Sequence, residues 1–527
     1  MMFIQYLERI DNMEVSFTDV TVCGYSKMIN ARAIVDADVI VPDTRPDIGT
    51  VLAVRASAES CERYIKKDKM VFSGNLKFNI LYACEEETGR IYTIEHSIPF
   101  SHQTDSNGID EDAFTVGTCH ISKTDFNVRN SRKLRVEAEL SLPVRAYKQN
   151  EIKAVNGVDS DSDIPVRYSD CEGDRIVLCR EIEFDVSDSV ALPPDECSEH
   201  EIYDVSYRSD ISDVKTVNNK AVIKGIIPIK ILYGTENGVQ SYDTDISFTE
   251  IEDLETSGAS DRISSVFDVA DLSCSLSQSE SGIKADAEIK IRGRICIYDR
   301  CEYHVASDIY SPDYEYTSEC EKSDLADIAQ TSVNQTTVKD TVTVSDLSHP
   351  VSKILYMTAS TSQTDTVLAD SSVTVSGMLH STVIYQSEDG GLHSVSKNTP
   401  YEITESVSDG CNSACAELEV SNYSYIMGSP NEIQLRCVVR SITDSLKCSK
   451  KSFITAFSID SEKPVSRDSQ PSITVCYPDP DITLWDIAKK YSTTVGEIEA
   501  LNSVSDGDTL SRENPLLIAK RTGGIKA

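Results

Sequence analysis

One strand-like pattern occurs three times in this chain of 527 residues, at spacings of 151 and 152 residues. The copies read VFSGNLKFNILY from Val71, VIKGIIPIKILY from Val222 and TVSGMLHSTVIY from Thr374. Aligning their glycines also aligns their final tyrosines without a gap, which chance explains poorly. Because a chain of this length exceeds a single ordinary core, the repeat predicts three related units.

Apolar and polar residues alternate within each copy, the period of a half-buried strand. The shared glycine falls on the inward face, which predicts a bulge or the close approach of another backbone. In the second copy Pro228 cannot donate to a ladder, so that strand should lie at an edge or have an unpaired stretch there. We expect the tyrosines, Tyr82, Tyr233 and Tyr385, to end a core strand with the hydroxyl reaching solvent.

A second strand pattern recurs after each of these strands. LRVEAELSLPVRAY at 134–147 resembles IKADAEIKIRGRICIY at 283–298, and EIQLRCVVRSI at 432–442 is a weaker third copy. Two long strands around a turn-rich middle favour an antiparallel β-domain with little helix. The expected fold is therefore mainly β, with three repeated antiparallel β-domains followed by a small α+β module. We place these domains at residues 1–150, 175–310, 333–457 and 472–520.

The composition limits the partners of the chain. With 86 acidic and 50 basic residues, its formal charge of -36 disfavours nucleic acid and anionic lipid surfaces. No export signal and no apolar segment of about 18 residues stands out, so we expect a soluble cytosolic protein without membrane insertion. The 16 cysteines should then be reduced. The acidic stretches at 156–174 and 311–332 are predicted to be linkers or long surface loops.

Nothing in the sequence indicates catalysis. The histidines do not recur between the repeats, no Gly-rich phosphate loop is present, and the close cysteine pairs lack a second pair at metal-site spacing. We therefore expect no enzyme, no cofactor and no metal. A carbohydrate-processing enzyme remains an alternative that would need measurable turnover on glycan strands.

The tail from Ile473 to Ile518 has a different pattern of strand, two short helices and strand. Thr483 with Asp486, and Thr494 with Glu497, have the spacing of a capping box at each helix start. Apolar residues at helical spacing follow both starts, so the two helices should pack on the two strands and form a βααβ module.

The block TLWDIAKKYSTTV at 483–495, with the later ALN and LLI, resembles the LysM module. LysM modules bind N-acetylglucosamine glycans such as peptidoglycan beside the loop before the first helix and the loop before the last strand. The resemblance thus implies a partner- or glycan-binding site in the loops at 479–484 and 510–515. Its candidate residues are Asp479, Asp481, Ile482, Thr483, Leu484, Trp485, Leu510, Arg512, Glu513 and Asn514.

Two departures from the LysM pattern favour a protein partner over a glycan. Asp481 and Ile482 replace the usual Gly-Asp, and Glu513 replaces a glycine that lets a sugar approach the backbone. Eight acidic against four basic residues at 472–520 also suit a protein partner. Trp485, the only tryptophan, could pack in the module, bind sugar or anchor a protein.

At the other end of the chain, VIVPDTRPDIGTVL at 39–52 and the SGxxxxxILY strand resemble the SPOCS domain of clostridial spore-coat proteins. The prolines and aspartates of PDTRPDI either stiffen a turn, which we favour, or form a partner-binding loop. Three SPOCS-like units before a LysM module imply a scaffold in the mother-cell cytoplasm, at the forespore or spore-coat surface. Its implied partners are a spore-coat morphogenetic ATPase, bound through the LysM end, or other coat proteins. The alternative is a wall-associated protein that binds peptidoglycan.

Overall fold

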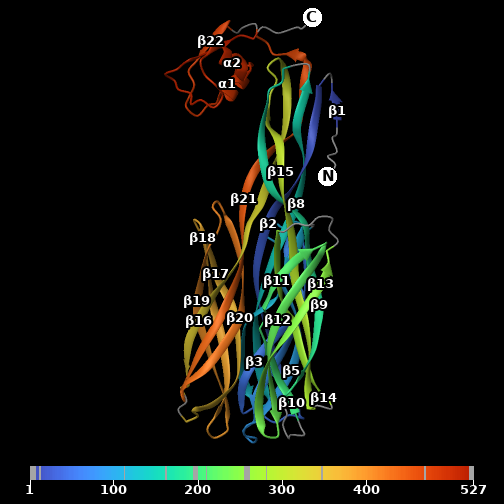
Figure 1. The fold of residues 1–527 in the computed structure, drawn as a ribbon, viewed down its shortest axis with the longest axis vertical. Coiled ribbons are helices and arrows are strands. Elements are labelled where there is room, and N and C mark those ends of the chain that lie inside the picture. The colour runs from blue at the N-terminus through green and yellow to red at the C-terminus, as the bar shows by residue number, and fades with distance from the viewer. Residues whose placement is uncertain are drawn as a thin grey trace.

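The protein is described by a computed structural model. It describes residues 7–10, 13–111, 113–160, 163–193, 200–208, 210–254, 262–279, 282–345, 348–467 and 471–521. Nearly all of its regular structure is antiparallel strand, and both described helices lie near the C-terminus (Figure 1). The predicted mainly-β fold class is confirmed.

Each repeat folds into two small sheets that pack face to face around an apolar core. The first sandwich contains β2 (Met13–Ile40), β8 (Lys133–Ser160) and β7 (His120–Asn130), packed on β3 (Thr50–Lys66), β4 (Lys69–Ala83) and β5 (Ile91–Asp105). Two short strands, β1 (Leu7–Ile10) and β6 (Phe114–Gly117), pair with β2 and β8.

The second and third sandwiches repeat this arrangement. The second contains β9 (Val166–Ala191), β15 (Gly282–Ile309) and β14 (Ile263–Ser279), packed on β10 (His200–Tyr207), β11 (Asp210–Val217), β12 (Lys220–Thr235) and β13 (Gly238–Asp253). The third contains β16 (Tyr314–Thr343), β21 (Glu432–Pro464) and β20 (Ser413–Ser429), packed on β17 (Val351–Ala369), β18 (Ser372–Ser387) and β19 (Leu392–Ser406).

The repeated strands are β4, β12 and β18, and each is the central strand of its small sheet. The ladder near each glycine is irregular. In the first unit a register shift between Ala58 and Ser60 lies opposite Leu76 and Asn75, next to Gly74, and similar shifts occur in the other two units. A Cβ atom on Gly74 would lie 1.9 Å from the carbonyl oxygen of Ser60. The predicted bulge and close backbone approach are both confirmed.

Pro228 interrupts the pairing of β12 on one side. Strand β13 pairs with β12 along its whole length, but on the other side β11 pairs up to Ile226 and β10 begins at Ile229. The predicted unpaired stretch at Pro228 is therefore confirmed, because proline has no N–H to donate there.

The repeated tyrosines differ from the prediction. Tyr82 is fully buried, and its hydroxyl donates to the carbonyl oxygen of Pro46 at 3.0 Å instead of reaching solvent. Tyr233 and Tyr385 are buried as well. The strand ends inside the protein, where a buried hydroxyl needs a partner.

The two acidic segments predicted to be linkers are strands. Strands β8, β9 and β16 run through most of 156–174 and 311–332, so the linker prediction was wrong. Small or apolar side chains are hidden among the acidic ones; Cys171 and Leu325, for example, are buried. With β2, β15 and β21 these strands form a stalk that extends beyond the three sandwiches and carries the C-terminal module (Figure 1).

The three units meet along one line through the molecule. At the sandwich end of this line Leu81, Leu232 and Ile384 share one apolar cluster. These are equivalent residues, since each precedes the repeated tyrosine. The apolar clusters of the stalk likewise contain residues from all three units. The repeat has thus produced an approximate threefold arrangement inside a single chain.

Candidate functional site

The C-terminal module has the expected order of strand, two helices and strand. It contains β22 (Ile473–Cys476), α1 (Leu484–Lys490), α2 (Val495–Leu501) and β23 (Leu516–Ala519). Both helices start with the predicted capping box, from Thr483 with Asp486 and from Thr494 with Glu497. Hydrogen bonds to Thr483 lower the pKa of Asp486, as expected for a carboxylate at a helix N-terminus.

The two loops predicted to bind a partner or glycan lie beside each other. Arg512 joins them, because its Nε donates to Oδ1 of Asp479 at 2.7 Å. Asp481, Ile482, Glu513 and Asn514 are exposed. The ion pair therefore lies between the two loops that flank the sugar groove in the LysM pattern.

Three other predicted residues face inward. Leu484, Trp485 and Leu510 belong to the apolar core of the module, and Thr483 is occupied as the helix cap. The structure thus brings the ten predicted residues into one region but divides them into an exposed rim and a buried floor. Whether this region binds a partner stays a prediction.

Trp485 attaches the module to the end of the stalk. Its ring meets the ring of Tyr310 edge-on, with centroids 5.0 Å apart, and its indole N–H donates to Oδ2 of Asp308 at 2.8 Å. Lys489 donates to both oxygens of the same carboxylate, at 2.7 and 2.9 Å. The Tyr310 hydroxyl donates to the carbonyl oxygen of Thr493 at 2.8 Å. In this structure the indole packs within the chain, which was one of the three alternatives.

The sequence offered no signal for this attachment. Asp308 and Tyr310 lie at the end of β15, about 175 residues from the module, and outside every predicted site. A second anchor follows β23, where Arg521 pairs with Asp163 at 2.9 Å and with Glu497 at 3.5 Å. The module is therefore held against the stalk at two places.

The outer face of the β22–β23 sheet is apolar and exposed. Val475 and Leu517 are direct cross-strand partners with exposed fractions of 50% and 42%. Ile473 of β22 and Tyr477, which follows β22, are exposed by 59% and 64%. Leu516 and Ile518 point inward to the core. Such a group of exposed apolar side chains is typical of an interaction surface.

The PDTRPDI loop has an internal anchor. Arg132 donates to the carbonyl oxygens of Val41, Pro42 and Arg45 at 2.9 to 3.2 Å, and it pairs with the carboxylates of Asp43 and Asp47. The guanidinium group of Arg132, together with the Tyr82 hydroxyl on the carbonyl oxygen of Pro46, thus holds the motif in one shape. This arrangement agrees with the favoured hypothesis that PDTRPDI is a stiffened turn.

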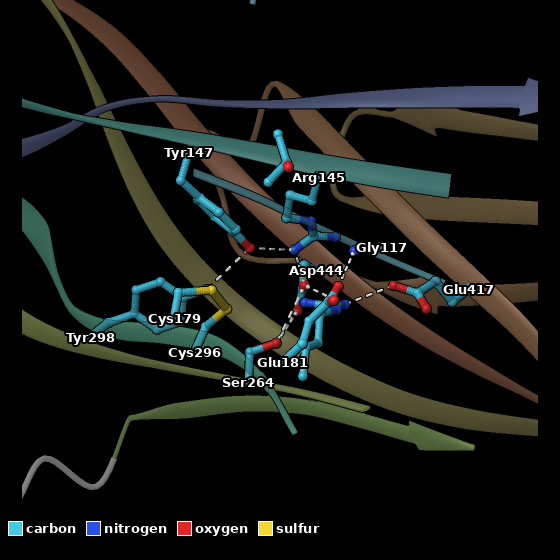
Figure 2. The surroundings of a disulfide bond; sticks show 12 residues. Gly117, Arg145, Tyr147, Cys179, Glu181, Ser264, Cys296, Tyr298, Glu417 and Asp444 are labelled. Carbon is cyan, nitrogen blue, oxygen red and sulfur yellow. Dashed lines mark hydrogen bonds and ion pairs between the residues drawn. A yellow bond between two sulfur atoms is a disulfide. The ribbon is translucent and has the colours of Figure 1, made fainter. Parts of the chain in front are cut away.

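A cluster of buried charges lies on the line where the three units meet, and no pattern in the sequence indicated it. Arg145, Arg294 and Asp444 each lie twelve residues after the first residue of their strands, so they are equivalent positions. Asp444 pairs with Arg145 and lies 3.9 Å from Arg294, which also binds Glu417 at 2.7 Å. We call Arg145, Arg294 and Asp444 the axial ion cluster. Figure 2 shows Arg145 and Asp444 of this cluster beside a disulfide bond.

That disulfide joins Cys179 of β9 to Cys296 of β15. For this pair the prediction of reduced cysteines was wrong. The two residues are direct partners in the ladder, with Cα atoms 4.0 Å apart, although they are separated by 117 residues in sequence. The equivalent positions in the other units do not reveal the pair, because Tyr147 and Leu446 occupy the place of Cys296.

Across the described parts of the chain, no group of three or more His, Cys, Asp or Glu side chains is placed to hold a metal ion. In the same residues no helix has the length and apolar character needed to cross a membrane.

Two family models match this chain, one in the sandwiches and one in the C-terminal module. The family model described as SipL, SPOCS domain, matches residues 47–129 and 200–277, which lie in the first and second sandwiches. The LysM domain model matches residues 481–512. No curated protein matches the chain. No solved structure matches it either.

The chain is therefore a protein that contains both SPOCS and LysM domains. Within that class it is a SipL-like protein. These domain families are non-catalytic and indicate a sporulation-related role in coat or wall binding. The third sandwich has the same fold although the SPOCS model does not extend to it.

Proposed function

We propose that this chain is a non-enzymatic scaffold of spore-coat assembly whose LysM module binds a coat morphogenetic protein. It would act in the mother-cell cytoplasm, at the forespore surface. Its proposed domains are residues 1–150, 175–310, 333–457 and 472–520. The observation that carries the proposal is the exposed apolar face of β22–β23, around Val475 and Leu517. Its partner would be a coat ATPase or another coat protein.

The charge around this face supports a protein partner of a particular kind. The residues at 472–520 include eight acidic and four basic side chains, and Asp479 and Asp481 follow directly after β22. A matching surface would have an apolar centre and basic residues at its rim. Three sandwiches on the same chain would add further weak contacts, and linked contacts raise the overall affinity through effective concentration.

The loops that would hold a glycan are less suited to their ligand. The Arg512–Asp479 ion pair would have to open or be covered when a sugar enters between them. Glu513 adds an exposed carboxylate, whose burial under a sugar would cost free energy. Peptidoglycan binding is therefore the second candidate, supported by the LysM match itself.

The test compares two glutamates placed on the module of the full-length protein. Val475→Glu puts a charge in the centre of the apolar face, and Ala500→Glu puts the same charge on an exposed position of α2. In calorimetry with the purified coat ATPase, we expect Val475→Glu to weaken binding about tenfold or more and Ala500→Glu to leave it nearly unchanged. Equal binding by both variants would remove the face from the interface. Sugar-dependent retention of the wild-type protein on purified peptidoglycan would favour the wall-binding alternative.

A further inference from the structure

In each sandwich, the sheet centred on the repeated strand β4, β12 or β18 ends in an outer strand. These outer strands are β5, β13 and β19. In the described residues each of them pairs on one side only, with β4, β12 and β18 respectively. A strand that is unpaired on one side presents free N–H and C=O groups to any chain that can add to it. The sequence of each outer strand decides whether that edge is open.

Two of the three edges carry proline at the same place. Pro99 of β5 pairs with Asn75, the residue after the repeated glycine, and Pro400 of β19 pairs with the equivalent Met378. In β13 the equivalent position, opposite Ile226, is Ser247. Proline in an edge strand removes a donor and hinders strand addition. The edge of β13 is therefore the one of the three that lacks this protection.

The register shows which groups of β13 point outward. Thr235 and Gly238 pair across a two-residue turn, so ladder hydrogen bonds start there and recur at alternate residues. Ser247 is one of the alternate residues whose N–H and C=O groups make no ladder hydrogen bond to β12. Proline at the equivalent positions, Pro99 and Pro400, agrees with this register, because a proline nitrogen could not donate to the ladder. The backbone groups of the odd-numbered residues at 243–251 thus face away from β12.

The side chains of the same five residues are exposed, and Ile251 is exposed by 55%. Asp243 and Asp245 supply negative charge toward the start of β13, while Ile251 supplies an apolar contact toward its end. Asp243 is partly neutralised by Lys230 at 2.8 Å, whereas Asp245 forms no ion pair with any residue that the structure describes. The edge therefore combines open backbone groups with an acidic and an apolar subsite.

We propose that the outer edge of β13 accepts an extended segment of a partner protein as an added strand. The segment would carry Lys or Arg near Asp243 and Asp245 and an apolar residue near Ile251. Main-chain hydrogen bonds would supply affinity, and these side chains would supply specificity. A second copy of the chain is a poorer occupant, because each copy has a formal charge of -36.

The test uses the full-length protein and two labelled synthetic peptides followed by fluorescence anisotropy. One peptide alternates lysine and valine, and the other has the same sequence with every backbone nitrogen methylated. The two peptides have equal charge, but only the first can complete a ladder. We expect the methylated peptide to bind about tenfold more weakly or worse, because several hydrogen bonds are lost. Equal affinities would show attraction to the acidic protein alone and would overturn the proposal.

The protein variants use a substitution that the fold already contains. Ser247→Pro copies the natural Pro99 and Pro400, so we expect it to fold and to lose at least about tenfold in affinity for the unmethylated peptide. Thr249→Ala changes a side chain on the same edge but keeps its N–H, and its affinity should stay nearly unchanged. Unaltered peptide binding by a folded Ser247→Pro protein would refute the proposal that the outer edge of β13 is the binding site. Wild-type dimers that Ser247→Pro dissociates in sedimentation would instead identify a second copy as the occupant. If Ser247→Pro does not fold, the comparison of the two peptides still decides.

Discussion

Asp444→Asn tests whether the axial ion cluster holds the three units together. The substitution keeps the size of the side chain and removes its charge, which leaves Arg145 and Arg294 buried with exposed fractions of 5% and 3%. Breaking a buried ion pair by removing one partner costs about 3–5 kcal/mol, because the other charge stays desolvated. Arg294 keeps Glu417 at 2.7 Å, so the lower end of this range, about 3 kcal/mol, is the expected loss in the free energy of unfolding.

The assay is urea unfolding, since guanidinium is a salt and would screen the charges under study. The matched control is Asp460→Asn, which removes an exposed ion pair with Lys463 and should leave the unfolding midpoint nearly unchanged. A loss for Asp444→Asn below about 1 kcal/mol would contradict this prediction, because it would mean that the two guanidinium groups are not desolvated as the structure shows.

The same variant predicts a pH dependence. Burial raises the pKa of Asp444, but Arg145 and Arg294 outweigh this effect and the pKa is lowered overall. A carboxyl group with a lowered pKa stabilises the folded state above its unfolded pKa of about 3.9, and this stabilisation is lost as the pH falls through the folded value. The stability difference between wild type and Asp444→Asn should therefore be full at neutral pH and shrink on acidification below about pH 4. A difference that grows in acid would contradict this sign.

Three further predictions address the glycine, the module attachment and the repeated tyrosine. Gly74→Ala should lower the free energy of unfolding by about 1–3 kcal/mol or more, because the new methyl group meets the backbone of Ser60, and a fully stable variant in urea unfolding would contradict the close approach. Asp308→Ala should shift the emission of Trp485 to longer wavelength, since this only tryptophan loses its anchor, and an unchanged spectrum would show that the carboxylate is not needed. Tyr82→Phe should cost about 0.5–1.5 kcal/mol in thermal unfolding, and a more stable protein would argue against its hydrogen bond.

Much of the LysM module could be predicted because its signals are local. The capping boxes at Thr483 and Thr494 join residues three positions apart, and the apolar stripe of each helix repeats within one turn. The exception is Leu501, which continues the stripe of α2 in the sequence but is exposed in the fold. The candidate loops could be placed by resemblance, yet their ion pair could not, since Asp479 and Arg512 are far apart along the chain.

The two segments predicted to be linkers show where prediction from the local sequence pattern fails. Strands β9 and β16 contain many acidic residues, and their alternation is obscured by small buried residues such as Cys171 and Ala326. Apolar periodicity identifies a strand when one face is clearly apolar. In the stalk the buried face is narrow, because strands from all three units share one core. Few apolar residues are therefore enough to cover that face of each strand.

The sequence alone determined the threefold repeat, the antiparallel strands, the glycine irregularity and the order of the C-terminal module. These features depend on residues that are neighbours in the chain or are copied from unit to unit. The packing of distant strands, in contrast, brings Arg145, Arg294 and Asp444 together, joins Cys179 to Cys296 and places Asp308 against Trp485. The physical reason is that burial, ion pairing and disulfide formation act through space. Sequence period reports which face of a strand is covered, whereas the identity of what covers it depends on how distant strands are packed.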